Sequence, residues 1–368
     1  MLSDLYARVA LSRVPGIGPH LFRALLTHFG TASEVLRAHP RELEAVEGIA
    51  TQTASSFRTY RDRSEREATA ILEFAERNEI QISCCLDATY PNRLANDSGS
   101  PSILYHLGQT DLQTPRTVAI IGTRQMTAYG SRQVERLLDP LADYAPLIVS
   151  GLAYGVDHAA HRRALQLGLP TLAVMGSGCQ HVYPAQHRRT ARQMVESGGG
   201  LLTEYPHWMK PDRTHFPARN RIVARMADLV VVVESGRRGG SIITVNMAND
   251  YGRRVGACPG RVGEESSAGC NELIKTGRAH LIETGEDIIR LLGWNGAAGR
   301  GKQRRLFDDL DAEETAVVDR LRDQSSVGLD DLRFALEVPA SQLAGTLMML
   351  EVKGVVKTLP GHRYRLSC

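Results

Sequence analysis

The spacing of hydrophobic residues changes twice along the chain and divides it into three parts. Up to about residue 80, apolar side chains recur every three to four positions, which is typical of amphipathic helices. Short, wholly apolar runs then alternate with helical stretches until about residue 282, as in a parallel sheet covered by helices. After residue 311 helical spacing returns, and the final residues alternate between apolar and polar positions.

The first part, residues 1–82, is predicted to be all helical. Helices are expected at the following positions: 3–13, 19–29, 40–46 and 61–78. The tight turn Val14-Pro15-Gly16-Ile17-Gly18-Pro19-His20 joins the first two, and Val46-Glu47-Gly48-Ile49-Ala50 is a weaker copy. The pair is similar to a SAM-like helix-hairpin-helix module. Its turn amides could meet a phosphate without reading bases, but few basic residues flank them, so a protein-contact role stays open.

The second part, residues 83–295, is predicted to be a Rossmann-like, doubly wound and mostly parallel sheet of the α/β class. Strands are expected at 117–121, 147–149, 171–175, 200–203, 229–233, 254–258 and 279–282, with an edge strand at 102–107. Helices are expected near 128–143, 156–168, 186–197, 217–226 and 240–252. In such sheets ligands bind at the carboxyl ends of the strands.

The third part begins with a flexible basic linker, residues 296–310, and continues as a winged-helix domain over 311–368. Its helices are expected near 311–323, 328–336 and 340–353, before a hairpin of residues 354–359 and 361–366. The presumed recognition helix is mostly apolar, and only Arg363 and Arg365 on the wing suggest contacts with a nucleic-acid backbone. The sequence therefore leaves open whether this domain contacts duplex DNA or a protein.

Composition narrows the class of protein without deciding the ligand. The net charge is only +3, and five of the 44 basic residues are lysines. Arginine suits phosphate recognition, but genomic base composition also explains such a bias, so the local placement of arginines must carry the argument. No apolar run is long enough for a membrane span, no signal peptide is evident, and the cysteines form no disulfide or metal pattern. We expect a cytoplasmic protein without a membrane partner or a metal.

Glycine-rich turns follow the predicted strands, and arginines stand where several helices are expected to begin. The helix dipole disfavours a cation at a helix start unless an anion is bound there. The turns therefore predict a phosphate-binding cleft, although an internal ion pair, with Glu234 as a candidate partner, is the rival explanation for Arg219 and Arg221. The candidate binding residues are Gly122, Thr123, Arg124, Ser150, Gly151, Gly176, Ser177, Gly178, Arg188, Arg189, Arg219, Asn220, Arg221, Gly240 and Ser241.

The motifs of the common cofactor and catalytic sites are absent from the sequence. No Gly-x-Gly-x-x-Gly follows the first strand, there is no P-loop, and no Ser-His-Asp order or carboxylate pair is evident. We therefore expect no cofactor and no catalysis. One enzymatic alternative stays open, a nucleotide-processing Rossmann enzyme of the phosphoribohydrolase type with Glu204 or Glu234 as its catalytic acid. Several aromatic residues near the turns could stack on a base: Tyr129, Tyr154, Tyr183, Tyr205 and Phe216.

The turns, taken in order, resemble those of the DprA/Smf family, the DNA-processing proteins of bacterial transformation. The matching segments are Ile121-Gly122-Thr123-Arg124, Ser150-Gly151-Leu152-Ala153, Asp157-His158-Ala159-Ala160-His161, Gly176-Ser177-Gly178, Tyr183-Pro184, Thr203-Glu204-Tyr205-Pro206, Phe216-Pro217-Ala218-Arg219-Asn220-Arg221-Ile222, Gly240-Ser241-Ile242-Ile243-Thr244 and Pro259-Gly260. Departures include Ala185 and His187 where the family often has Lys or Asn, and Gly239 in place of a serine.

The resemblance implies a function that the composition alone does not. It implies that the candidate residues line a pocket for single-stranded DNA, that the protein protects incoming DNA, and that it loads the RecA recombinase during natural transformation. It also implies a homodimer formed through the Rossmann-like domain and no catalytic activity. Helix-hairpin-helix and winged-helix modules flank this domain in many members, which agrees with the predicted architecture.

Overall fold

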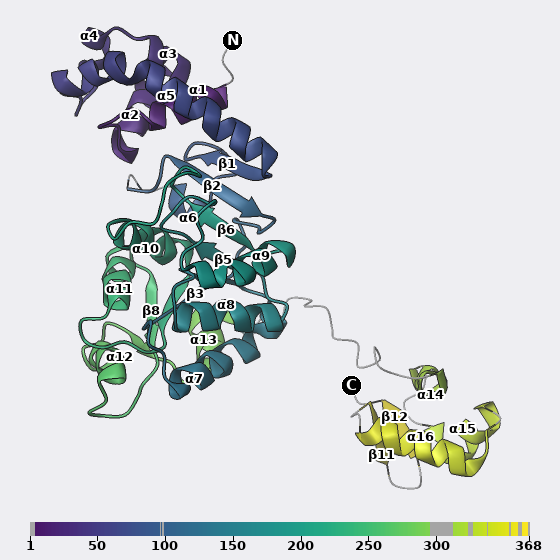
Figure 1. The fold of residues 1–368 in the computed structure, drawn as a ribbon. Coiled ribbons are helices and arrows are strands. Elements are labelled where there is room, and N and C mark those ends of the chain that lie inside the picture. Colours follow the sequence, from purple (N-terminus) through teal and green to yellow (C-terminus); the bar gives the residue numbers. More distant parts are fainter. Residues whose placement is uncertain are drawn as a thin grey trace. The chain divides into compact units, whose positions relative to one another are not determined.

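The structure is a computed structural model that describes residues 4–95, 97, 99–294, 312–322, 327–336, 338–352, 355–359 and 363–366. The chain forms two compact units, Met1–Gly299 and Arg300–Cys368 (Figure 1). The predicted linker 296–310 lies outside the described residues.

The first unit opens with the predicted helical module. Its helices are α1 (Asp4–Ser12), α2 (Pro19–Phe29), α3 (Ala32–Arg37), α4 (Pro40–Leu43) and α5 (Thr51–Arg77). The last helix was predicted to begin at residue 61, but it begins at Thr51. Ala54 and Phe57, which are buried and lie about one turn apart, extend its apolar face toward the amino end. Gly16 and Gly48 both have a φ of +87°, a conformation that favours glycine, so both hairpin turns have the same backbone form.

A sheet of nine strands follows the helical module, with the order β1-β2-β6-β5-β4-β3-β7-β8-β9. The strands are β1 (Ile80–Cys84), β2 (Ile103–Gly108), β3 (Thr117–Ile121), β4 (Leu147–Ser150), β5 (Thr171–Val174), β6 (Gly200–Thr203), β7 (Leu229–Val232), β8 (Arg254–Ala257) and β9 (His280–Leu281). Only the pairs β1–β2 and β2–β6 are antiparallel. The doubly wound, mostly parallel fold class is confirmed.

One strand prediction was wrong in position and one strand was missed. The run at 102–107 was expected at the sheet edge, but β2 pairs with β1 on one side and with β6 on the other. The edge is β1, which the sequence pattern did not show because it follows α5 after only Asn78 and Glu79. The predicted boundary between residues 82 and 83 falls inside this strand.

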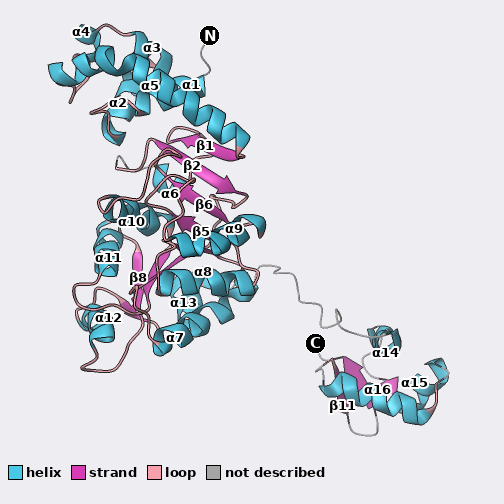
Figure 2. Ribbon diagram, viewed as in Figure 1, coloured by secondary structure: helices cyan, strands magenta, loops and turns pink. Residues whose placement is uncertain are grey.

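Helices cover both faces of the sheet, as Figures 1 and 2 show. They are α6 (Asn92–Ala95), α7 (Ala128–Leu138), η1 (Asp139–Tyr144), α8 (Val156–Gln166), η2 (Ala185–His187), α9 (Arg188–Glu196), α10 (His215–Met226), α11 (Gly240–Asp250), α12 (Glu265–Lys275) and α13 (Gly285–Leu292). Val118 and Ile120 of β3 belong to the core under α7, α8 and α13, whereas Ala119 and Ile121 belong to the core that includes α10, α11 and α12. This alternation follows from the two-residue period of a strand.

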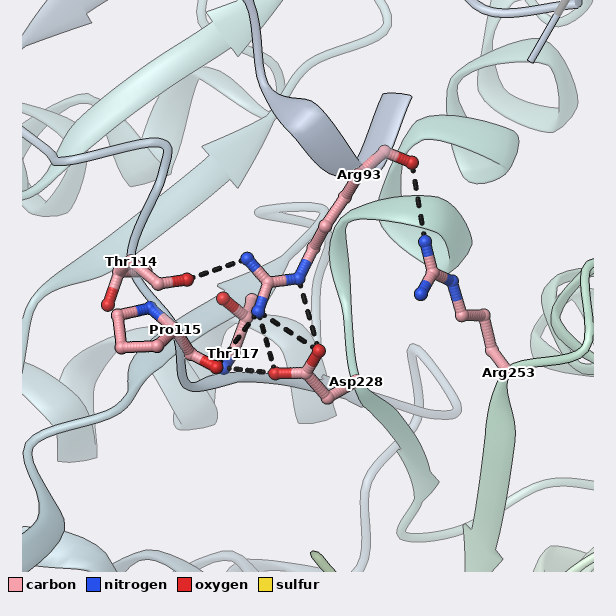
Figure 3. A network of polar contacts seen from close by, with 6 residues as sticks. All are labelled: Arg93, Thr114, Pro115, Thr117, Asp228 and Arg253. Carbon is pink, nitrogen blue, oxygen red and sulfur yellow. Dashed lines mark hydrogen bonds and ion pairs between the residues drawn. The ribbon is translucent and has the colours of Figure 1, made fainter. Parts of the chain in front are cut away.

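A partly buried ion pair holds the amino ends of the central strands β3 and β7 together (Figure 3). Arg93 donates from Nη2 to Asp228 Oδ2 at 2.8 Å and from Nη1 to the Thr114 carbonyl at 2.6 Å. Asp228, just before β7, also accepts from the amide of Thr117 at the start of β3. The segment between β1 and β3 is therefore clamped to the sheet at the end opposite the strands' carboxyl termini.

The second unit has the elements of the predicted winged helix. They are α14 (Ala312–Arg322), β10 (Val327–Gly328), α15 (Leu329–Leu336), α16 (Ala340–Val352), β11 (Val356–Leu359) and β12 (Arg363–Leu366). The predicted hairpin is present, and β10 adds a third strand beside β12. A separate apolar core that includes Val318, Leu332 and Leu347 holds the unit together.

Candidate nucleic-acid interface

A cavity of about 610 Å³ opens at the carboxyl ends of the central strands. From β3 the chain crosses to β4 on one side, whereas from β7 it crosses to β8 on the other. The loops after β3 and β7 therefore diverge, and a crevice at this switch point is the general ligand site of doubly wound sheets. Eight predicted residues line the cavity: Gly122, Thr123, Arg124, Gly151, Arg219, Asn220, Gly240 and Ser241.

Arg124 is the exposed cation of the loop after β3. Its guanidinium carbon lies 5.6 Å from the centre of the Phe216 ring, and the Phe216 ring lies 5.6 Å from that of Tyr183. All three side chains line the cavity. Within the described residues Arg124 has no carboxylate at ion-pair distance, so its charge faces the cavity without compensation.

Arg213 is a second exposed arginine on the cavity wall, and the sequence prediction missed it. It lies two residues before α10, which begins at His215. A cation just ahead of a helix start is the same electrostatic anomaly that pointed to the other arginines, so the signal was present in Asp212-Arg213-Thr214.

Arg219 was expected at a helix start, but it lies one turn inside α10 and is buried, with 5% of its surface exposed. Its Nη1 donates to the Gly151 carbonyl at 2.7 Å and also to the Val174 carbonyl. Burial lowers its pKa, and the nearby Asp157 opposes that shift. The side chain therefore ties α10 to the loop after β4 and to the last residue of β5.

Asp157 fixes the turn that follows β4. Its Oδ2 accepts from the amides of Gly151 at 3.2 Å and of Ala153 at 3.4 Å. Burial raises the pKa of this carboxyl, and Arg219 opposes the effect. Both backbone groups of Gly151 are thus engaged inside the protein, so Gly151 contributes shape rather than a donor. Leu152 next to it has a φ of +56°, an uncommon conformation for a residue other than glycine.

The other predicted residues do not line the cavity. They are Ser150, Gly176, Ser177, Gly178, Arg188, Arg189 and Arg221. The Ser150 hydroxyl is buried and donates to the Ile120 carbonyl at 2.6 Å, and the Ser177 hydroxyl donates to the His181 carbonyl at 2.5 Å. Both hydroxyls therefore support the loops from within.

Packing explains the positions of Gly176 and Gly178, and ion pairing explains that of Arg221. Gly176 lies against the Phe216 ring, and Gly178 lies against the backbone of Pro206 and His207. Arg221 was also expected at a helix start, but it lies inside α10, does not line the cavity, and pairs with Glu204. The rival explanation, an internal ion pair, holds for this residue, although the partner is not Glu234. Arg188 and Arg189 are exposed at the first turn of α9.

Neither candidate catalytic acid of the enzymatic alternative lines the cavity. Glu234 is buried and accepts from the Thr127 hydroxyl at 2.6 Å and from its amide at 2.9 Å. Glu204 is paired with Arg221, and burial raises its pKa. Within the described part of the chain, no group of His, Cys, Asp and Glu side chains could hold a metal ion.

Some of the aromatic residues around the turns line the cavity, and the others are engaged elsewhere in the protein. Tyr183 and Phe216 line the cavity, whereas Tyr129 donates to the Pro259 carbonyl and Tyr205 stacks on His215 at 4.1 Å. Tyr154 donates to Gln186 at 2.9 Å outside the cavity. Two of the five rings are therefore placed to stack on a ligand in it.

Comparison with protein families identifies the relatives of this chain. The family model for DNA recombination-mediator protein A matches residues 81–293, which contain the whole cavity. The chain belongs to the DprA/Smf family. A DprA winged-helix model matches residues 303–362, and a SAM-like helix-hairpin-helix tandem matches residues 9–56.

Individual DprA relatives agree with this assignment. A protein Smf from Synechocystis is 28% identical over 97% of this chain and 97% of its own length. A putative DNA processing protein DprA from Mycobacterium tuberculosis is 37% identical over 73% of this chain and 69% of its own length. The X-ray structure of DprA from Streptococcus pneumoniae covers 77% of this chain and 97% of that chain at 30% identity, with a TM-score of 0.67.

A further related structure concerns DNA binding by a DprA protein. It concerns the single-stranded DNA binding mode of DprA from Helicobacter pylori, is 32% identical, and covers 58% of this chain and 97% of that chain with a TM-score of 0.52. Among the described helices of the present chain, none has the length and hydropathy of a membrane span.

Proposed function

We propose that this chain binds single-stranded DNA in the cavity at the carboxyl ends of β3, β4 and β7. The observation that carries the proposal is that exposed arginines and aromatic rings line the same cavity. Neither Arg124 nor Arg213 has a carboxylate at ion-pair distance among the described residues, the Phe216 ring lies beside Arg124, and the Tyr183 ring lies beside Phe216. Arginine forks grip phosphates, and aromatic rings stack on unpaired bases whatever their identity.

The neighbouring polar groups support the same ligand. Thr123, Asn220 and Ser241 line the cavity, and α11 begins at Gly240 without a side-chain cap. Amides at a helix start favour a phosphate. The related Helicobacter pylori structure, which concerns a single-stranded DNA binding mode, supports the choice of single-stranded DNA.

The biological role rests on family membership rather than on the cavity. As a DprA/Smf protein, the chain is proposed to protect incoming single strands and to load RecA on them in natural transformation. A homodimer formed through the sheet domain and a cytoplasmic location belong to the same proposal. Measuring RecA filament growth on a long single strand, with and without the chain, tests the loading role; unchanged growth would contradict it.

Charge reversal of Arg124 tests the proposed site. Arg124→Glu should weaken binding of a fluorescent oligothymidylate at least tenfold, because it replaces an attractive phosphate contact by repulsion. The matched control is Arg254→Glu, which changes an exposed arginine at the opposite end of the sheet and should alter affinity less than twofold. Equal affinities of Arg124→Glu and the wild type would refute the proposal.

The absence of catalysis is also a proposal, and nucleotide hydrolysis is its direct test. Glu204 and Glu234 are engaged inside the protein, which argues against the phosphoribohydrolase alternative. Incubation with nucleoside monophosphates, followed by chromatography, should give no released base. Base release that Glu204→Gln or Glu234→Gln abolishes would favour the enzyme instead.

A further inference from the structure

The wing of the second unit has two chemically different faces. In the β11–β12 pair, Lys357 lies opposite Arg365 and Leu359 lies opposite Arg363, so these four side chains share one face. Lys357, Arg363 and Arg365 are exposed. On the other face, Val356, Tyr364 and Leu366 belong to the apolar core or pack against it. The outer face of the wing is therefore cationic and the inner face is hydrophobic.

The cross-strand pair Lys357–Arg365 is electrostatically unfavourable as it stands. Like charges directly opposite each other on adjacent strands destabilise the pairing. Within the described residues neither side chain has a carboxylate at ion-pair distance. Glu351, which approaches the wing, accepts from the amide of Thr358 at 3.3 Å. An anion that contacts both cations would relieve the repulsion between them.

Helix α16, which would read bases in an ordinary winged helix, lacks the chemistry for that task. From Ala340 to Leu350 it has no ionisable side chain, and its exposed surface includes Met348 and Met349, which are 69% and 53% exposed. Gln342 donates to Glu313 at 2.7 Å. Base readout needs polar side chains flanked by phosphate contacts, so α16 does not provide a sequence-reading surface.

We propose that the outer face of the wing binds the phosphate backbone of duplex DNA without sequence preference. The outer face has cations for phosphates, but it has no ring among the described residues, because Tyr364 lies on the opposite face and packs against the core, so the outer face cannot stack on an unpaired base. Duplex DNA has about one charge per 1.7 Å of axis, twice the density of one strand, which favours it as the partner of a small cationic surface. This site is separate from the proposed single-strand cavity of the first unit.

Charge reversal on the wing of the full chain tests the inference. Lys357→Glu with Arg365→Glu should weaken binding of a 25-base-pair duplex at least tenfold and reduce the slope of log affinity against log salt by about 2. The matched control is Arg320→Glu with Arg333→Glu, which makes the same change in net charge at exposed positions of α14 and α15. The control should change duplex affinity less than twofold.

Three further measurements make the result decisive. Thermal unfolding should be unchanged in both double variants, two duplexes of unrelated sequence should bind equally, and oligothymidylate affinity should stay within twofold of the wild type. Equal losses of duplex affinity in the two double variants would show that the effect comes from net charge alone, and would overturn the proposal. A larger loss for oligothymidylate than for duplex would overturn the assignment to duplex DNA, whereas Arg124→Glu separately tests the cavity.

Discussion

At the scale of single residues, burial decides what each arginine does. Arg219 is 5% exposed and donates to the Gly151 and Val174 carbonyls, and Arg221 pairs with Glu204. Arg124 and Arg213 are exposed on the cavity wall. A buried arginine such as Arg219 would leave polar groups unsatisfied without its partners, and Arg221 is occupied by an ion pair, so both stabilise the protein, whereas Arg124 and Arg213 are available to a ligand.

Gly155 lies where the loop after β4 closely approaches the loop after β3. Its φ is +74°, and a Cβ there would lie 2.7 Å from the Arg124 carbonyl carbon and would also meet the Thr123 carbonyl oxygen. Gly155→Ala should lower the free energy of unfolding by about 3 kcal/mol, because left-handed strain and overpacking add. Urea denaturation measures the change.

A matched substitution separates the two causes. Gly168 has a φ of +67°, but its Cβ would meet no atom within 4 Å. Gly168→Ala should therefore cost about 1 kcal/mol, from backbone strain alone. Similar losses at the two glycines would show that the close approach of the loops after β3 and β4 does not constrain Gly155.

At the scale of elements, a neutral histidine joins α8 to the sheet. His161 is fully buried, and its Nδ1 lies 2.7 Å from the Thr171 hydroxyl of β5. That hydroxyl gives its hydrogen to the Ile148 carbonyl of β4, so it accepts from Nδ1. The Nε2 atom has no partner within the described residues. Burial lowers the pKa of His161 to about 3, since a proton on Nε2 would be a buried, unpaired charge.

The low pKa of His161 predicts that the protein becomes less stable as the pH falls. The folded state disfavours protonation of His161. The free energy of unfolding therefore loses nothing to this residue above the unfolded pKa of about 6.5, and it declines as the pH falls toward the pKa of the folded state. His161 should contribute a loss of about 1.4 kcal/mol per pH unit in that window. Urea denaturation between pH 7 and 4.5 measures the slope, which should be shallower by this amount in His161→Gln. Parallel curves would contradict the assignment.

At the scale of the whole molecule, the chain has two units with separate hydrophobic cores. Within the described residues, the core of the second unit is built from residues of 317–366, and those of the first are built from residues up to 294. The proposed single-strand cavity lies wholly in the first unit, and the cationic wing lies wholly in the second. The two proposed activities should therefore be separable.

Truncation tests this separation. A chain of residues 1–299 retains its own cores and should bind oligothymidylate within twofold of the full chain, while its affinity for a 25-base-pair duplex should fall at least tenfold. Fluorescence anisotropy with the two ligands measures both. Loss of oligothymidylate binding on truncation would show that the second unit takes part in the single-strand site.

Much of the fold follows from local patterning. The apolar runs at 117–121 and 229–233 identify two central strands, because only strands buried on both faces are continuously apolar. The strand β1 escaped prediction, since no turn signal separates it from the long helix before it. Its pairing with β2 depends on partners that are distant in sequence.

By itself the sequence determined the fold class, most strands of the sheet, the place of the glycine turns, and the family to which the chain belongs. Those properties depend on local periodicity and on residues that are neighbours in the chain. Only the tertiary structure decided which turn residues face the ligand: it buried Arg219, paired Arg221 with Glu204, and brought Arg213 to the cavity wall. The physical reason is that exposure and ion pairing depend on contacts between loops far apart in sequence, which no local pattern encodes.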